Sequence, residues 1–146
     1  MPAGGPAVPY TPVVVSLPIA DRQVSHDFYR AVLGLATIGE PAGDGLPEPL
    51  QFEVNAGLRL MLVPTGGFGW VLGGREVADR RHTECVLGLT VDGPAEVGSL
   101  VSRARDAGAE VVTEAGPQPW GYAGTFADPD GHLWMVTAAG AAGQEE

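Results

Sequence analysis

The chain has 146 residues, and its 18 Asp and Glu against 8 Lys and Arg give a formal net charge of −10 at pH 7. This length suits one hydrophobic core, and the acidic surface would repel nucleic-acid phosphates and anionic lipids. The single cysteine, Cys85, excludes an internal disulfide, and the N-terminus has no charged segment followed by an apolar run. We therefore expect a cytoplasmic protein without nucleic-acid or membrane partners.

The first half of the chain predicts a strand, a helix and a hairpin. After a Pro- and Gly-rich arm, expected to be loosely held, the β-branched residues 13–17 predict a buried strand. Asp21 is a candidate N-cap for a helix over residues 22–33, and Gly34 follows where a helix-ending glycine belongs. The apolar stripe of this helix contains Val24, Phe28, Val32 and Leu33. Residues 50–54 and 58–63 then flank a turn and predict a hairpin.

The two faces of this hairpin differ in polarity. One is wholly apolar, whereas the other mixes Glu53 and Arg59 with Met61 and Val63, which is more typical of a cavity wall than of a solvated surface. Glu53 and Arg59 point to the same face of neighbouring strands. We expect them to form an ion pair at the edge of a cleft.

The second half follows a Gly-rich connecting loop, residues 64–83, in which Phe68 and Trp70 are the aromatic residues. A loop of this length is either a lid or a linker whose aromatics enter the core. A strand from residue 84 and a helix opened by Pro94 and closed by Gly108 come next, with Val97, Leu100, Val101 and Ala104 as its apolar stripe. Residues 109–113, 120–126 and 132–137 predict three more strands, and the small, acidic tail should fray.

The two halves repeat the same order of elements. Each has a strand, a helix preceded by Asp, a glycine stop and three strands, so the sequence predicts βαβββ twice. We expect a single α+β domain with module one at about 12–63 and module two at about 84–138. Its curved mixed sheet would have helices on the convex face and a central cleft, where ligands usually bind, on the concave face.

Two motifs resemble those of a known family. Residues 28–35, FYRAVLGL, match the FYxxxLGL pattern of the vicinal oxygen chelate (VOC) superfamily, and Asp128-Pro129-Asp130-Gly131 matches its late turn. This superfamily includes glyoxalase I, bleomycin-resistance proteins and extradiol dioxygenases. The resemblance covers about residues 12–138 and implies the duplicated fold, but it is nearly silent on function.

Enzymes of this family hold a divalent metal with side chains from the first, fourth, fifth and eighth strands. The resemblance places these positions at Val14, Met61, Val86 and Met135. Valine has no donor atom, and a thioether is a soft ligand that does not suit a hard cation. The sequence thus predicts no metal site and no cofactor.

The same positions would give the cleft an apolar floor, with Glu53 and Arg59 beside it. Trp120, Tyr122 and Phe126 share one face of a strand, which either lines the cleft or packs under a helix; we expect the cleft. Trp134 alternates with Met135 and is expected in the core under the second helix. The predicted ligand-binding residues are Val14, Glu53, Arg59, Met61, Trp70, Val86, Trp120, Tyr122, Phe126 and Met135.

These residues favour a metal-free protein that binds a small molecule. The resemblance to the drug-binding branch suggests sequestration of a planar or cationic antibiotic or other secondary metabolite. The alternative is a VOC-type lyase, isomerase or dioxygenase acting on a small carbonyl or aromatic compound with an atypical or absent metal site. Glu53 or Glu84 would then be the general base, while Arg59 polarises an oxygen. An interaction module with a filled cleft is a third possibility, and the resemblance also suggests a homodimer formed through sheet edges.

Overall fold

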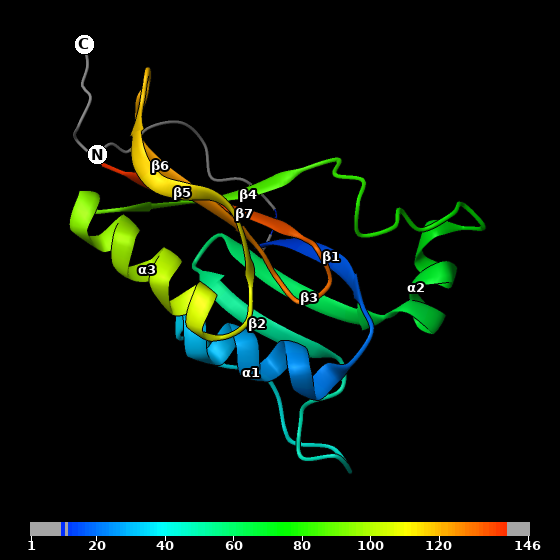
Figure 1. Ribbon diagram of the computed structural model, residues 1–146. Coiled ribbons are helices and arrows are strands. Elements are labelled where there is room, and N and C mark those ends of the chain that lie inside the picture. Colours follow the sequence, from blue (N-terminus) through cyan, green and yellow to red (C-terminus); the bar gives the residue numbers. More distant parts are fainter. Residues whose placement is uncertain (1–9, 11, 140–146) are drawn as a thin grey trace.

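The computed structural model describes residue 10 and residues 12–139, so most of the expected arm and tail lies outside the described residues. The chain order is β1 (Val13–Ile19), α1 (Arg22–Leu33), β2 (Leu50–Asn55), β3 (Leu58–Pro64), α2 (Thr65–Leu72), β4 (Val86–Val91), α3 (Pro94–Asp106), β5 (Glu110–Gln118), β6 (Gly121–Ala127) and β7 (Leu133–Ala138) (Figure 1). The strands form two mixed sheets, β1-β3-β2 and β4-β7-β6-β5. The predicted α+β class is therefore confirmed.

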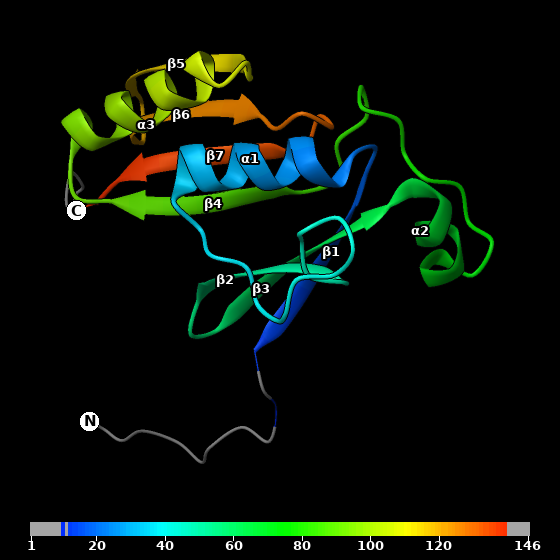
Figure 2. The same cartoon turned by 90° about the horizontal axis from the view of Figure 1, so that it is seen from below.

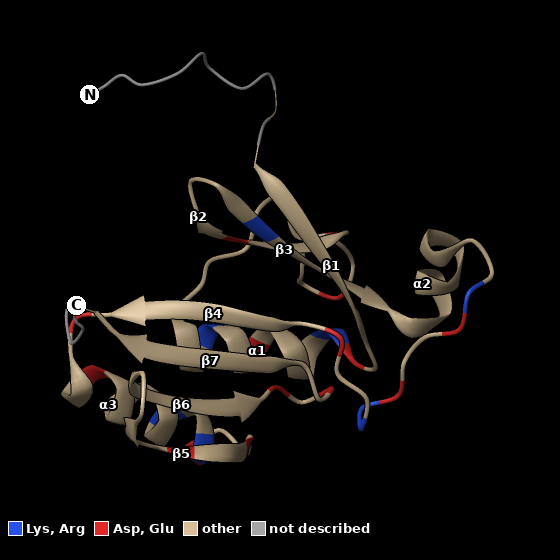
Figure 3. Cartoon of the chain, turned by 90° about the horizontal axis from the view of Figure 1, so that it is seen from above, with Lys and Arg blue, Asp and Glu red and all other residues tan. Residues whose placement is uncertain are grey.

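Each sheet contains one parallel pair, β1 with β3 and β4 with β7, and its other pairs are antiparallel. This matching topology is the duplication that the sequence predicted. In the first module the strand directly after the helix is reduced to one bridge, between Thr37 and Phe52. Helices α1 and α3 lie on one side of the second sheet (Figure 2), and the opposite side of that sheet carries no helix (Figure 3).

Helix α1 forms where its capping residues predict it. The Asp21 carboxylate accepts a hydrogen bond of 3.0 Å from the Val24 amide, and Gly34 ends the helix in the left-handed conformation with φ of 66°. Its buried side is Ser25, Phe28, Tyr29 and Val32, whereas Val24 is 52% exposed. The predicted stripe was therefore wrong at Val24. The buried side instead includes Tyr29, because α1 packs against both sheets.

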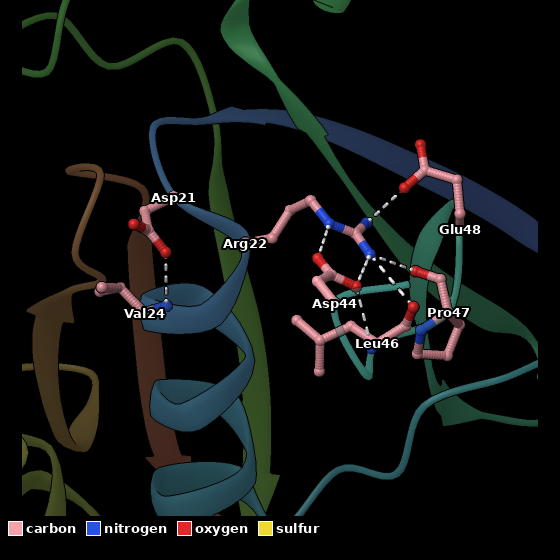
Figure 4. Close-up of polar contacts among 7 residues, drawn as sticks. All are labelled: Asp21, Arg22, Val24, Asp44, Leu46, Pro47 and Glu48. Atoms are coloured by element: carbon pink, nitrogen blue, oxygen red, sulfur yellow. Dashed lines mark hydrogen bonds and ion pairs between the residues drawn. The ribbon is translucent and has the colours of Figure 1, made fainter. Parts of the chain in front are cut away.

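The N-terminus of α1 is also fixed to the long loop before β2 (Figure 4). The Arg22 guanidinium pairs with Asp44 and Glu48, each at 2.9 Å, and donates to the carbonyl oxygens of Leu46 and Pro47. The hydrogen bond from Arg22 is the main cause that lowers the pKa of the Asp44 carboxyl to about 2. Arg22 therefore connects the Asp44–Glu48 part of this loop to the start of α1.

Helix α2 was missed by the sequence analysis, which placed it inside the connecting loop. Gly66, Gly67 and Gly69 fall within its eight residues, and each glycine costs about 1 kcal/mol relative to alanine in a helix. Tertiary contact overrides this propensity, because Phe68 is buried, and α2 packs on β1 and β3.

The core joins the modules through α1. The Tyr29 ring lies 5.8 Å from both Phe52 of β2 and Trp134 of β7, and the Phe28 ring lies 6.2 Å from Phe126 of β6. Trp134 is 1% exposed, which confirms it as a core residue. The prediction placed Trp134 under the second helix only, whereas its indole also contacts Tyr29 of α1.

A buried polar network at the Asp128–His132 turn accompanies this packing. Tyr29 donates a 2.5 Å hydrogen bond to the Asp128 carboxylate, and the Trp134 indole donates to the Tyr29 hydroxyl oxygen at 2.9 Å. The other Asp128 oxygen accepts from the amides of Asp130 and His132. Burial raises the pKa of both the Asp128 carboxyl and the Tyr29 hydroxyl.

We expect Tyr29→Phe to lower the free energy of unfolding by about 1–3 kcal/mol, because it leaves one oxygen of the buried Asp128 carboxylate and the buried Trp134 indole N–H without a partner. Urea unfolding followed by circular dichroism would measure the change. Tyr122→Phe is the matched control, since the half-buried Tyr122 hydroxyl makes no hydrogen bond with the described residues. Equal losses in the two variants would contradict a special role for the network.

Candidate ligand-binding pocket

A pocket of about 680 Å³ lies where the end of β1 meets the start of β4. Its outer wall is α2 and the segment that leads to β4, and its inner wall includes the Asp130–Leu133 turn. Small-molecule sites in proteins typically have volumes of about 300–1,000 Å³. The main apolar side chains in its walls are Leu17, Phe68, Leu72, Val77, Leu87 and Leu133.

The pocket lies beside the strand faces that carry the family metal positions Val14, Val86 and Met135. We call the alternate residues along each of these faces a row. Alternate residues of a strand share a face, so Pro18 lies on the same face of β1 as Val14. Leu133 lies likewise on the face of Met135, and Glu84 lies two residues before Val86. Pro18, Glu84 and Leu133 all line the pocket. The enclosed volume therefore lies next to the predicted rows, but Leu17 and Leu87 of the opposite strand faces line it too, and the predicted residues themselves lie outside it.

The predicted floor is more open than a binding cavity. Val14 and Val86 are 43% and 48% exposed, and Met61 and Met135 are half-buried. Val14 is on the first sheet and Val86 on the second, and neither lines the pocket. The enclosed volume lies at one end of the two sheets, because α2 and the connecting segment cover the sheets only at that end.

Glu53 and Arg59 do not form the expected ion pair, although they face each other in the strand register. Among the described residues no salt bridge joins them, and the buried Arg59 Nε has no hydrogen-bond partner. An irregularity between Glu53 and Asn55 interrupts the register, and the Glu53 side chain is exposed. Such a bulge turns side chains away from the regular pairing direction.

The aromatic face of β6 was assigned to the wrong side. Phe126 is fully buried, and Tyr122 packs partly buried against the same core. Gly124, between them, faces α3, because a Cβ placed there would lie 2.9 Å from the Val101 side chain. Alternation alone identifies residues that share a face but cannot say which face meets the helices.

Both exposed tryptophans lie outside the pocket. Trp120 is 60% exposed in the turn before β6, and the register of Ala127 with Leu133 puts the other end of β6 at the pocket. Trp70 is 88% exposed on α2, whose Phe68 and Leu72 line the pocket instead. The sequence analysis did not identify Phe68 and Leu72 as pocket residues, because it predicted no helix in this segment.

The polar part of the pocket wall is predominantly acidic. Glu76 and Glu84 line it without a hydrogen bond to any described group. His82 pairs with Asp79 at 2.7 Å, and this contact is the main cause that lowers the pKa of the Asp79 carboxyl. The one arginine of the wall, Arg80, donates to the Pro129 carbonyl. Figure 3 shows both acidic and basic residues along the segment between α2 and β4.

The family metal does not fit these residues. Val14, Met61, Val86 and Met135 supply no oxygen or nitrogen donor from their side chains. Within residue 10 and residues 12–139, no group of three or more His, Cys, Asp or Glu is placed to hold a metal ion. The exposed Cys85 in the pocket wall is a single thiol and does not replace a ligand set.

The paired modules, each with one parallel strand pair, have the arrangement of the VOC fold. The family model described as Glyoxalase/Bleomycin resistance protein/Dioxygenase superfamily matches residues 12–136, so the chain belongs to this superfamily. Among curated proteins, no sequence matches the chain. None of the helices in the described part of the chain is long and apolar enough to span a membrane.

Solved structures share this fold. A glyoxalase-related enzyme from Fulvimarina pelagi is 28% identical with a TM-score of 0.73, and the match covers 90% of this chain and 88% of that one. A hypothetical protein from S. aureus is 23% identical with a TM-score of 0.74 over 92% and 96% of the two chains. TnmS3, an antibiotic binding protein from Streptomyces sp. CB03234, is 23% identical with a TM-score of 0.60 over 92% and 98%.

We expect protein purified without a chelator to carry no stoichiometric divalent ion, because the four family positions lack suitable donors. Inductively coupled plasma mass spectrometry of the purified protein measures this directly. About one Ni, Zn, Fe or Mn per chain that is lost in Glu84→Gln would contradict the prediction and would identify the pocket as a metal site.

Proposed function

We propose that this protein binds a planar or cationic organic molecule, such as an antibiotic or another secondary metabolite, in the pocket and sequesters it in the cytoplasm without metal. The observation that carries the proposal is the volume of about 680 Å³ between apolar walls, at the end of the rows that family positions indicate. The pocket has apolar surface for an aromatic ligand, and polar side chains such as Glu76 and Glu84 in its wall could orient the ligand. The antibiotic-binding description of TnmS3 is consistent with this proposal.

Binding is favoured over catalysis by the chemistry of the side chains. The family positions that activate substrates through a metal are apolar here, and Glu53 is exposed outside the pocket. A metal-free lyase or isomerase remains the second candidate, because Glu84 lines the pocket and could act as a general base. Arg59, the expected polarising group, is not part of the pocket wall. Recovery of a bound compound unchanged, measured by mass spectrometry, distinguishes sequestration from turnover.

We expect Phe68→Ala to weaken binding of the neutral probe N-phenyl-1-naphthylamine by about tenfold or more, because it removes an aromatic wall of the pocket. Probe fluorescence during titration gives the dissociation constant. Trp70→Ala is the matched control, since it removes a larger aromatic group from the same helix but outside the pocket. Equal affinity in the two variants, both folded by circular dichroism, would contradict the proposed site.

The unpaired carboxylates of Glu76 and Glu84 should favour cations. We expect Glu84→Gln to weaken binding of 9-aminoacridine, which is protonated at neutral pH, by about threefold or more at low salt. Binding of neutral acridine should stay nearly the same. Glu53→Gln makes the identical change in charge outside the pocket and should affect neither probe. An equal loss of affinity for 9-aminoacridine and for acridine would contradict a role of the Glu84 charge in binding.

We also propose that the protein forms a homodimer through sheet edges. Val13, Val14, Val86 and Val112 are 43–63% exposed, and they lie on β1, β4 and β5, which are all edge strands. An exposed apolar edge strand pairs readily with another chain, whereas lysine on the edge prevents this.

We expect Val86→Lys combined with Val112→Lys to convert a dimer into a monomer, as measured by light scattering during size-exclusion chromatography. Val71→Lys is the control, because Val71 is 51% exposed on α2 and not on a strand. A wild-type protein that stays monomeric at high concentration would refute the proposed dimer.

A further inference from the structure

The outer wall of the pocket is a segment with little regular structure. Residues 73–85 contain no helix or strand, and nearly all of them are exposed. The backbone hydrogen bonds of this segment stay local, from Arg75 to Leu72 and from His82 to Asp79. Asp79 accepts from the Arg81 amide as well. The segment therefore folds on itself more than onto the sheets.

Among the described residues, Arg80 is the side chain of this segment that makes a hydrogen bond to a residue distant in sequence. Arg80 Nη1 donates to the Pro129 carbonyl at 2.6 Å, across 49 positions of sequence. Pro129 belongs to the turn that is held by the buried Asp128. This exposed wall is thus attached to a turn that is held by buried hydrogen bonds.

The backbone at Arg80 also lies directly against Gly131. Gly131 has φ of +92°, and a Cβ there would lie 2.7 Å from the Arg80 Cβ and 2.9 Å from its carbonyl oxygen. Only a glycine leaves room for this approach, so the turn is shaped to receive Arg80. Hydrogen bond and contact together fix the wall at a single residue.

The other end of the wall is held weakly. Helix α2 has eight residues with three glycines, no side-chain cap at its N-terminus, and Phe68 as its buried residue. Isolated helices of this length are unstable in water, so α2 depends on its contacts with β1 and β3. The wall is thus held at this end by the contacts of α2 with β1 and β3 and by the hydrogen bond from the Thr65 hydroxyl to the Ile19 carbonyl.

We propose that residues 73–83 form a cover over the pocket and that Arg80 is the latch that keeps it closed. A ligand enters when Arg80 leaves Pro129 and Gly131, and the latch closes again behind it. This inference rests on the proposed function, because it concerns access to the same pocket. Arg80 acts here as a positioning residue.

The latch is tested first in the free protein, by amide hydrogen exchange of peptides from residues 73–85 with mass spectrometry. Arg80→Ala should raise exchange in this segment about three- to tenfold, as expected for losing one solvent-exposed hydrogen bond of about 1 kcal/mol. Arg80→Lys can still donate to Pro129 and should restore most of the protection. Arg105→Ala is the matched control, since Arg105 is exposed and pairs only with Glu114.

The second test is stopped-flow binding of N-phenyl-1-naphthylamine. Arg80→Ala should raise both the association and the dissociation rate of the probe, and Arg80→Lys should return both rates toward the wild-type values. A purely structural defect would not raise the association rate. Unchanged exchange in Arg80→Ala overturns the latch even if the probe binds. Raised exchange with unchanged probe kinetics overturns the role in access. Raised exchange in a protein that binds no probe supports the latch but refutes the proposed function.

Discussion

The structure depends on a buried carboxylate that holds a tight turn of the second module against the first. Asp128 is 2% exposed, and its two oxygens accept hydrogen bonds from Tyr29 of α1 and from two amides of its own turn. An unpaired buried carboxylate would be strongly destabilising, so the turn and the helix must be placed together. Burial raises the Asp128 pKa, so the free energy of unfolding falls as the pH rises from the unfolded pKa to the folded pKa, and the hydrogen bonds to the carboxylate limit this loss.

Further contacts of the same turn extend this constraint to β1. Asp130 accepts from the Ala20 amide at 2.9 Å and from the Ser25 hydroxyl, and the His132 ring lies 2.7 Å from the Pro18 carbonyl. These contacts bring the end of β1 to the starts of β4 and β7, where the pocket forms. The Asp-Pro-Asp-Gly-His sequence thus joins the modules and shapes the pocket at once. The connecting segment then closes the pocket by resting on the same turn.

Much of the fold could be predicted from the sequence because its signals are local. The Asp21 cap, the glycine stops and the alternating strands fixed most element positions, and Val97, Leu100, Val101 and Ala104 of α3 are all buried as expected. The contact of Trp134 with α1 was not predictable in this way, because it depends on how the modules pack. Helix α2 could not be predicted in this way, because its three glycines disfavour a helix locally.

The site was predicted less well, for a physical reason. Periodicity and family positions identified the rows that contain Val14, Val86 and Met135, and the pocket lies next to those rows. Where a row becomes enclosed depends on what covers it, and that is decided by long-range contacts such as Arg80 with Gly131. The face of β6 was equally open to two interpretations, and the packing of Gly124 against Val101 decided it.

The central claim is that the enclosed end of the rows, and not their open part, is the ligand site. Nuclear magnetic resonance of the ¹⁵N-labelled protein during titration with N-phenyl-1-naphthylamine tests this most directly. The account predicts the largest amide shifts at Leu17, Phe68, Leu87 and Leu133. Shifts confined to Val14, Met61 and the Trp120 turn, with these four amides unchanged, would contradict it.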